Sequence, residues 1–219
     1  MQTNSLKSER TKVKRVPKNA QYEQEQIYSI LDHSYLVHIG FLFHNQSFVI
    51  PTLYGRYNDI LYIHGAASSR MIKNITEQSV CLTISKVTGL VLARSAFHHS
   101  MNYESVVLLG QPTLVEDLEE KELGLKIISD HLIPQRWEEV RGPNSKELKG
   151  TTVLKFKIQE GSAKVRTGHP KDEKSDHHLD IWAGQIPLKT IALPAIDDEL
   201  LREGIPVPES VTRYINQHQ

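Results

Sequence analysis

The chain has 219 residues, of which 39% are hydrophobic and 24% are charged, and its formal net charge is zero. These values are typical of a globular protein with one large or two small domains, and the balanced charge argues against nucleic-acid binding through bulk positive charge. No apolar run approaches the roughly 20 residues of a membrane helix, the N-terminus lacks the apolar stretch of a signal peptide, and the single Cys81 fits a reducing compartment, so we expect a cytoplasmic protein that binds neither membrane nor nucleic acid.

Residues 1–20 are rich in Lys, Arg, Ser and Thr, and they are predicted to be a mobile basic arm. Residues 21–195 are predicted to form one domain, and residues 196–219 a C-terminal tail with one short helical patch. Near the start of the domain Ile27, Ile30 and Leu31 recur at helical spacing, which predicts an amphipathic helix over residues 21–33.

Short β-rich runs then follow, separated by turn sequences. They predict strands over residues 35–43, 48–54, 60–64, 79–87, 90–97 and 104–115. Thr88 and Gly89 predict a hairpin, and Gly110 is a candidate β-bulge. Pro51 removes one donor from its strand, which indicates an edge, a bulge or a place where something other than a strand meets the backbone.

The later part of the chain predicts a helix over residues 116–131, which Gly124 weakens by about 1 kcal/mol relative to Ala. A strand follows over residues 151–158, then a polar loop over residues 161–178 and a last short strand that begins at Trp182. Six short strands with tight connections and one inserted helix favour a mainly β fold with α additions, a six-stranded barrel closed or nearly so. A parallel doubly wound sheet would need a helix after almost every strand.

The stretch from Leu61 to Ile75 combines a strand, a turn of small residues and the start of a helix that extends to about residue 78. Ser68 or Ser69 is a natural N-cap, and Arg70 follows directly. Backbone N–H groups, hydroxyls and a guanidinium at one spot suit a phosphate group. The alternative is an ordinary capped helix with a solvent-exposed arginine.

The other groups of polar residues give weaker indications of a functional site. The adjacent pairs His98-His99 and His177-His178 fit solvated loops, and no Cys or carboxylate cluster has zinc spacing, so no metal site is expected. The backbone around Ile50, Pro51 and Thr52 could meet a planar heterocycle, and the alternative is an edge strand whose proline only blocks aggregation.

The segments VIPTLYGRYNDILYIHGAASSRMIKNI, SVCLTI, GLVLARSAFHHSMNYESVV and NYESVVLLGQPTLVED resemble the FMN-binding split barrels similar to pyridoxamine 5′-phosphate oxidase. The resemblance covers residues 23 to about 188 and is strongest to the flavin-nucleotide-binding subgroup, which is similar to 5-nitroimidazole-resistance proteins. It implies a split barrel that forms a homodimer, with FMN bound at the subunit interface.

The resemblance also implies site residues. Ser69 and Arg70 match the phosphate-binding pair, with Ser68 and Lys73 nearby. The other implied contacts are with the ring, the ribityl chain or the partner's flavin: Ile50, Pro51, Thr52, His64, Gly65, Asn102, Tyr103, Ser105 and Trp182. The chain has Met71 where the oxidases have Lys, and it ends RYINQHQ where they have an Arg-x-His motif that holds pyridoxal, so no substrate is implied.

The function expected from these residues is an FMN-dependent oxidoreductase acting on an unidentified small molecule. No catalytic residue is assigned, although His98, His99, Asn102 and Tyr103 form a polar loop that either supplies a proton or closes the dimer. Three alternatives stay open: a non-catalytic flavin-binding module for storage or sensing, a haem-binding protein, and a purely structural barrel.

Overall fold

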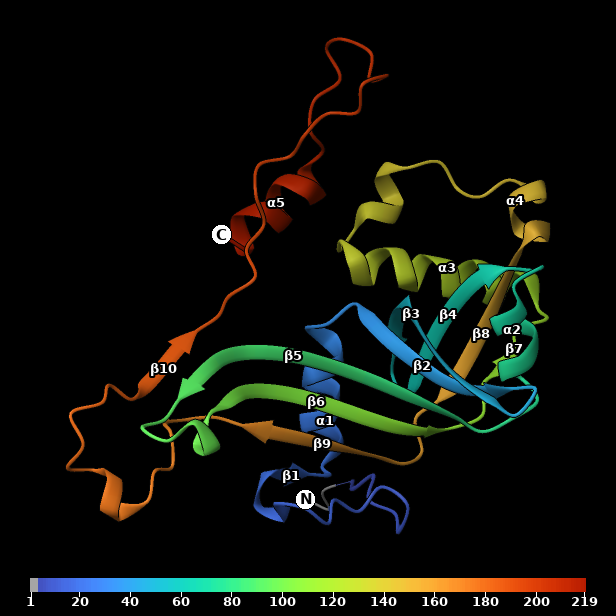
Figure 1. The fold of residues 1–219 in the computed structure, drawn as a ribbon. Helices are drawn as coiled ribbons and strands as arrows, with labels where there is room; N and C mark the ends of the chain where they lie inside the picture. The colour runs from blue at the N-terminus through green and yellow to red at the C-terminus, as the bar shows by residue number, and fades with distance from the viewer. Residues whose placement is uncertain (1–3) are drawn as a thin grey trace. The chain divides into compact units, whose positions relative to one another are not determined.

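The computed structural model describes residues 4–219, which form mainly antiparallel strands together with a few helices (Figure 1). The chain divides into two compact units. Unit 1 contains Met1–Pro51, Val80–Gly110 and Ile158–Lys189, and unit 2 contains Thr52–Ser79, Gln111–Lys157 and Thr190–Gln219. Residues 21–195, which were expected to form one domain, contribute to both units. The single domain therefore stays a prediction.

Unit 1 is built on an antiparallel sheet in the order β1-β9-β6-β5-β2. Its strands are β1 (Ala20–Gln21), β2 (Leu36–Phe43), β5 (Val80–Leu92), β6 (Ser100–Gly110), β9 (Gly161–Arg166) and β10 (Gly184–Pro187). The last of these pairs with the second half of β5. A two-residue turn, His44 and Asn45, joins β2 to β3 (Gln46–Tyr57), and both residues have positive φ, as in a type I′ hairpin turn.

Three local predictions in unit 1 are wrong. No hairpin forms at Thr88 and Gly89, because β5 runs through them and pairs with β6 along its length. The bulge lies in β5, between Val87 and Gly89, whereas Gly110 is simply the last residue of β6. Residues 161–166 are not loop but strand β9, whose first residues, Gly-Ser-Ala, are small and buried and carry no β-branched pattern.

The predicted first helix is confirmed as α1 (Gln24–Asp32), with Ile27, Ile30 and Leu31 buried, and it packs on β6 and β9. The segment before α1 also has partners in unit 1. Leu6 is buried, its N–H donates to Tyr22 and its carbonyl accepts from Gly161. The side chains of Ser8 and Arg10 bind Glu160. The sequence predicted a mobile basic arm over residues 1–20 and did not predict these contacts. Residues 1–3 lie outside the described part of the chain.

Unit 2 contains the end of β3, then β4 (Ile60–Ala66), β8 (Thr151–Lys157) and β7 (Thr113–Leu114), paired in that order. Helix α3 (Leu118–Leu132) packs on β4 and β8. It begins at the N-cap Asp117, whose carboxylate accepts the N–H of Glu120 at 2.8 Å. The helix predicted over residues 116–131 is therefore confirmed.

Gly124 explains how closely α3 approaches this sheet. A Cβ at this position would lie 2.8 Å from the Tyr62 ring and 2.9 Å from Val153, closer than side chains tolerate. Tyr62 and Val153 form a buried cluster with Val115 and Ile128. The glycine that weakens the helix by propensity thus permits its packing.

Three shorter helices complete the described chain: α2 (Arg70–Ile75), α4 (Ser145–Gly150) and α5 (Glu209–Gln217). Single 3-10 turns occupy Pro17–Asn19, Ala96–His98, Arg136–Glu139 and Lys174–Asp176. The helical patch expected in the C-terminal tail is α5, whose buried Ser210 donates to Glu139. None of the helices in residues 4–219 has the length and apolarity needed to cross a membrane.

Candidate functional site

The start of α2 has the arrangement expected from the sequence. Strand β4 ends at Ala66, and the N–H of Ser69 closes a turn onto the Ala66 carbonyl at 2.8 Å. Ser69 is the N-cap residue, yet its side chain makes no capping hydrogen bond. The helix ends at Ile75, one turn earlier than predicted.

One side of α2 is buried and the other carries the candidate phosphate ligands. Met71, Ile72 and Ile75 are buried in unit 2. Residues three and four apart share a helix face, so Ser69, Arg70 and Lys73 lie together on the other side. Arg70 and Lys73 are exposed there, and Ser68 is exposed in the preceding turn. Two hydroxyls and two cations therefore gather at one end of a short helix.

Gly65 has a packing role in the same region. A Cβ at Gly65 would lie 2.8 Å from Cγ1 of Ile72, so the missing side chain lets α2 lie against β4. Contact between Gly65 and a flavin stays a prediction.

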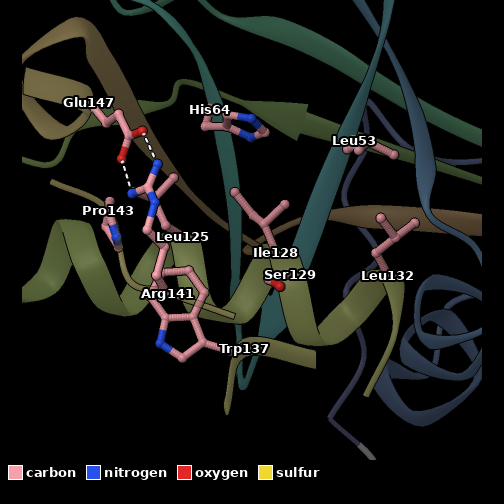
Figure 2. A pocket seen from close by; sticks show the side chains of 10 residues that line it. All are labelled: Leu53, His64, Leu125, Ile128, Ser129, Leu132, Trp137, Arg141, Pro143 and Glu147. Carbon is pink, nitrogen blue, oxygen red and sulfur yellow. Dashed lines mark hydrogen bonds and ion pairs between the residues drawn. The ribbon is translucent and has the colours of Figure 1, made fainter. Parts of the chain in front are cut away.

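A cavity of about 450 Å³ lies elsewhere in unit 2, between β4 and the face of α3 (Figure 2). Most of its lining is apolar, and its polar members are a histidine, a serine and an ion pair. The lining residues are Leu53, His64, Leu125, Ile128, Ser129, Leu132, Trp137, Arg141, Pro143 and Glu147. A mostly apolar cavity with few polar groups is typical of a cofactor or small-molecule site.

His64 has an unusual environment in this cavity. Its Nδ1 is buried and has no hydrogen-bond partner among the described residues. Burial lowers the pKa of His64 below its ordinary value, because desolvation disfavours the imidazolium. The side chain is therefore a neutral imidazole with an unsatisfied nitrogen, which is the form that binds transition metals.

Arg141 and Glu147 form a bidentate ion pair beside the same cavity, as Figure 2 shows. The two nitrogen–oxygen distances are 2.8 and 2.5 Å. The Arg141 guanidinium and the N–H of Asn144 lower the pKa of Glu147 to about 2. Asn144 and Glu147 also form the capping box of α4, so the carboxylate is fixed in place.

The three residues predicted to lie along the flavin ring belong to β3. Ile50 and Thr52 are half-buried and Pro51 is exposed. The register of β3 with β4 begins at Tyr54, so these three residues lie outside that paired stretch. Ile50 and Pro51 belong to unit 1 and Thr52 to unit 2.

The remaining predicted residues lie in unit 1. Asn102, Tyr103 and Ser105 follow one another along β6. Asn102 is buried, donates to Gln185 at 2.9 Å and accepts from Arg166, while the Ser105 hydroxyl donates to the Lys164 carbonyl at 3.3 Å.

Trp182 is 65% exposed, and its ring packs over Gly184 at the start of β10. It belongs to unit 1, like the predicted residues of β6, whereas Ser68, Ser69, Arg70 and Lys73 belong to unit 2. The predicted residues are therefore divided between the two units.

The side chains of the first histidine pair, His98 and His99, have ordinary partners. Nδ1 of His99 accepts the N–H of Ala93 at 3.0 Å, and His98 lies 3.8 Å from Glu173. Within residues 4–219, no three His, Cys, Asp or Glu side chains lie close enough together to hold a metal ion.

Sequence reasoning missed the cavity partners of His64 and the contact of Arg166 with Asn102. Trp137, Arg141 and Glu147 occur in a segment that reads only as loop or short helix, and Arg166 falls in a stretch that reads as polar loop. No local pattern marks them, because their neighbours are distant in sequence.

A model of the pyridoxamine 5′-phosphate oxidase family matches residues 23–165. No curated protein matches the chain. The structure of the flavocytochrome Anf3 from Azotobacter vinelandii is 40% identical, with a TM-score of 0.90 over 94% of this chain and 97% of that one.

Two further solved structures are similar. The FAD and haem binding protein from Mycobacterium smegmatis is 28% identical, with a TM-score of 0.86 over 90% of this chain and 97% of that one. A candidate 5-nitroimidazole antibiotic resistance protein from Bacteroides thetaiotaomicron is 26% identical, with a TM-score of 0.55 over 67% of this chain and 86% of that one.

Proposed function

Because the chain belongs to the pyridoxamine 5′-phosphate oxidase family, we propose that it is a flavin-binding redox protein. The family match confirms the resemblance seen in the sequence. The observation that carries the proposal is the start of α2, where the Ser69 hydroxyl makes no capping bond and lies beside the exposed side chains of Arg70 and Lys73. Hydroxyl and cationic groups at a strand-to-helix turn suit the phosphate of a flavin nucleotide.

The flavin proposed from the sequence is FMN. Arg70 and Lys73 would neutralise its phosphate, Ser68 and Ser69 would donate hydrogen bonds to it, and the backbone of residues 50–52 would face the ring. A bound flavin supplies the exchange of one or two electrons with a small molecule. The protein's part is to hold and orient the ring and to exclude water from it.

A homodimeric six-stranded split barrel with flavin at the subunit interface is part of the proposal. Two exposed apolar side chains on the β2–β3 hairpin support it, since Leu42 and Val49 are 52% and 66% exposed. An apolar surface of this kind is stabilised when a second copy covers it. A reducing compartment such as the cytoplasm fits the single Cys81.

A second candidate function, haem binding, is favoured by the His64 cavity. Its lining is mostly apolar, its imidazole is neutral, and its Nδ1 has no partner among the described residues. A mostly apolar cavity with a neutral imidazole in its lining suits a histidine-ligated haem. Two similar solved structures are described as a flavocytochrome and as an FAD and haem binding protein.

In this candidate His64 would ligate the iron, and Arg141 is the positively charged residue of the cavity lining. A bound haem supplies one-electron exchange. Leu125, Ile128 and Leu132 of α3 line the same cavity and would exclude water from the bound group. Contact between His64 and the flavin was predicted from the sequence; its place in this cavity supports the haem assignment.

The proposal is tested on the purified full-length protein by absorbance spectroscopy and mass spectrometry of the released cofactors. We expect a flavin spectrum, with FMN or FAD identified by mass. Addition of NADH or NADPH then separates turnover from a storage or sensing module, since a module holds a flavin that neither donor reduces. A colourless protein that takes up neither flavin nor haem would overturn both candidates.

Two variants separate the two cofactors. His64→Ala is expected to remove the haem absorbance and keep the flavin, whereas Arg70→Ala is expected to weaken flavin binding and keep the haem. Loss of flavin from His64→Ala together with unchanged haem would assign His64 to the flavin instead.

A further inference from the structure

Residues 167–183 form the long connection from β9 to β10 in unit 1 (Figure 1). Trp182 lies almost at the end of this connection. Apart from the 3-10 turn Lys174–Asp176, the connection contains no helix or strand. The backbone hydrogen bonds of residues 173–181 join residues two or three positions apart, so they form local turns. The course of the connection over unit 1 therefore depends on side chains that anchor it.

The middle of this connection is anchored through Asp172. Its carboxylate accepts the N–H of Arg94 at 2.8 Å and the Arg94 guanidinium at 2.9 Å, shortly after the end of β5. The Asp172 side chain is only 2% exposed, so the carboxylate is shielded from solvent. This ion pair fixes the middle of the connection and leaves its two ends to other contacts.

Both ends of the connection are tied to one guanidinium, that of Arg166. At the start of the connection, this group donates to the carbonyls of Gly168 and His169, at 3.3 and 3.4 Å. It also donates to Oδ1 of Asn102 in β6. The Asn102 amide donates in turn to Oε1 of Gln185 at 2.9 Å, in the strand that follows the connection. Arg166 therefore links the first residues of the connection to the strand in which it ends.

The position and the shape of Arg166 make this link possible. Arg166 is the last residue of β9 and pairs in register with Tyr103, which directly follows Asn102. A guanidinium is planar and presents several N–H groups in a fixed geometry, so it can serve acceptors on two elements at once. Asn102 is buried, and its amide oxygen would be left unsatisfied without this donor, which is unfavourable. Arg166 and Asn102 therefore hold each other in one orientation.

The strand held by this network also supports the Trp182 ring. A Cβ at Gly184 would lie 2.7 Å from Cζ2 of Trp182, so the ring rests on the backbone at the start of β10, next to Gln185. The rest of the Trp182 side chain is largely exposed. The orientation of the ring therefore depends on where the first residues of β10 are held.

Three of the residues expected to contact the flavin from unit 1 are Asn102, Tyr103 and Trp182. We propose that Arg166 is the positioning residue for this part of the flavin site. It orients the Asn102 amide and, through Gln185, fixes the end of β10 on which the Trp182 ring rests. The inference rests on the proposed flavin binding. Arg166 acts through these neighbours and does not itself bind the flavin.

Trp182 supplies the readout, because the chain has two tryptophans and Trp137→Phe leaves Trp182 as the single one. In this full-length background, Arg166→Gln is expected to lower the anisotropy of Trp182 emission and to increase its quenching by acrylamide, both in the cofactor-free protein. Samples saturated with FMN or with FAD are then compared by visible circular dichroism, which reports the contacts of the flavin ring. We expect Arg166→Gln to change this spectrum while the flavin stays bound.

Three further variants test the link itself. Arg166→Lys keeps the charge but lacks the planar fork, so it is expected to behave like Arg166→Gln. Gln185→Met removes the acceptor at the other end of the network and should change the Trp182 signals in the same direction. Combining Gln185→Met with Arg166→Gln should add little, because both changes break one network. The matched control Arg202→Gln removes an exposed arginine of the C-terminal tail and should leave all signals unchanged.

Unchanged Trp182 anisotropy and acrylamide quenching in Arg166→Gln would overturn the positioning role, and so would full rescue by Arg166→Lys, since charge alone would then suffice. Far-ultraviolet circular dichroism shows whether each variant is folded; if Arg166→Gln is not, Gln185→Met decides by the same signals. A wild type that binds no flavin, with Trp182 signals altered in Arg166→Gln, would contradict the proposed function and leave the structural link standing. Flavin bound by the wild type, with every signal unchanged in Arg166→Gln, would contradict this inference alone.

Discussion

His64 shows how one buried side chain can make the stability of the molecule depend on pH. Burial lowers its pKa below the ordinary value of 6.5. As the pH falls below about 6.5, the unfolded chain binds a proton that the folded chain does not, so the free energy of unfolding falls. The stabilising contribution is therefore complete above the unfolded pKa and is lost as the pH drops toward the folded pKa.

We expect the melting temperature of the cofactor-free protein to fall from about pH 7 to about pH 5.5, and to fall less in His64→Gln, which has no proton to gain. His178→Gln is the control, since His178 is exposed and should leave the wild-type dependence intact. Equal slopes for His64→Gln and the wild type would mean that His64 titrates alike in both states.

Arg70 is the residue on which flavin binding should depend most. Arg70→Ala is expected to weaken flavin affinity by about 1.5–3 kcal/mol, the range for a hydrogen bond to a charged group. Fluorescence titration measures the change, and Arg202→Ala, which removes an exposed arginine of the C-terminal tail, serves as the control. Unchanged affinity in Arg70→Ala would exclude a role at the phosphate.

The structural role of a single residue was predictable from sequence where it depends only on residues nearby in the chain. The N-cap position of Ser69 follows from the order of residues around it, and so does the buried face of α2. The environment of His64 and the contact between Arg166 and Asn102 were not predictable, because the contacting residues are far apart in the chain.

In helix α3, the packing of Gly124 leads us to expect a change in stability opposite to the one that helix propensity predicts. Gly124→Ala should stabilise an isolated helix by about 1 kcal/mol. In the protein we expect the reverse, a loss of about 1–3 kcal/mol, because the new Cβ would overlap the Tyr62 ring and Val153. Urea denaturation measures the change.

Gly142→Ala is the matched control for that experiment. A Cβ at Gly142 would meet only a flexible carboxylate oxygen of Glu122, at 3.9 Å, so stability should hardly change. A Gly124→Ala variant more stable than the wild type would show that α3 can shift away from the sheet at little cost.

Elements with strong periodicity were predictable, and those defined by a partner strand were not. Helices α1 and α3 follow from the spacing of their apolar residues. Thr88 and Gly89 were predicted to form a hairpin turn, but β6 offers hydrogen bonds along β5, so the strand continues through them. Strand β9 was not predicted, because its small residues suit buried pairing with β6 but show no alternation of apolar and polar residues.

For the whole molecule, the main prediction is a homodimer. We expect light scattering to give twice the chain mass, and Leu42→Glu/Val49→Glu to give a monomer, because charges on the β2–β3 hairpin would have to be buried. Leu193→Glu/Ile196→Glu is the control, since it adds the same two charges outside the β2–β3 hairpin. A wild-type monomer with full flavin content would contradict a shared site.

The sequence indicated a mainly β molecule with a few helices, and the structure agrees. It could not indicate that segments from three parts of the chain interleave in each unit, because such contacts depend on pairing over long separations.

The backbone of Leu6 has a consequence for any shortened form of this protein. Its N–H and carbonyl are both satisfied, by Tyr22 and Gly161, and the two residues of β1 shield the outer side of β9. Removing this N-terminal strap would uncover unpaired strand groups, which readily recruit strands from neighbouring molecules. The residues around Leu6 thus protect this edge of the sheet against strand-to-strand aggregation.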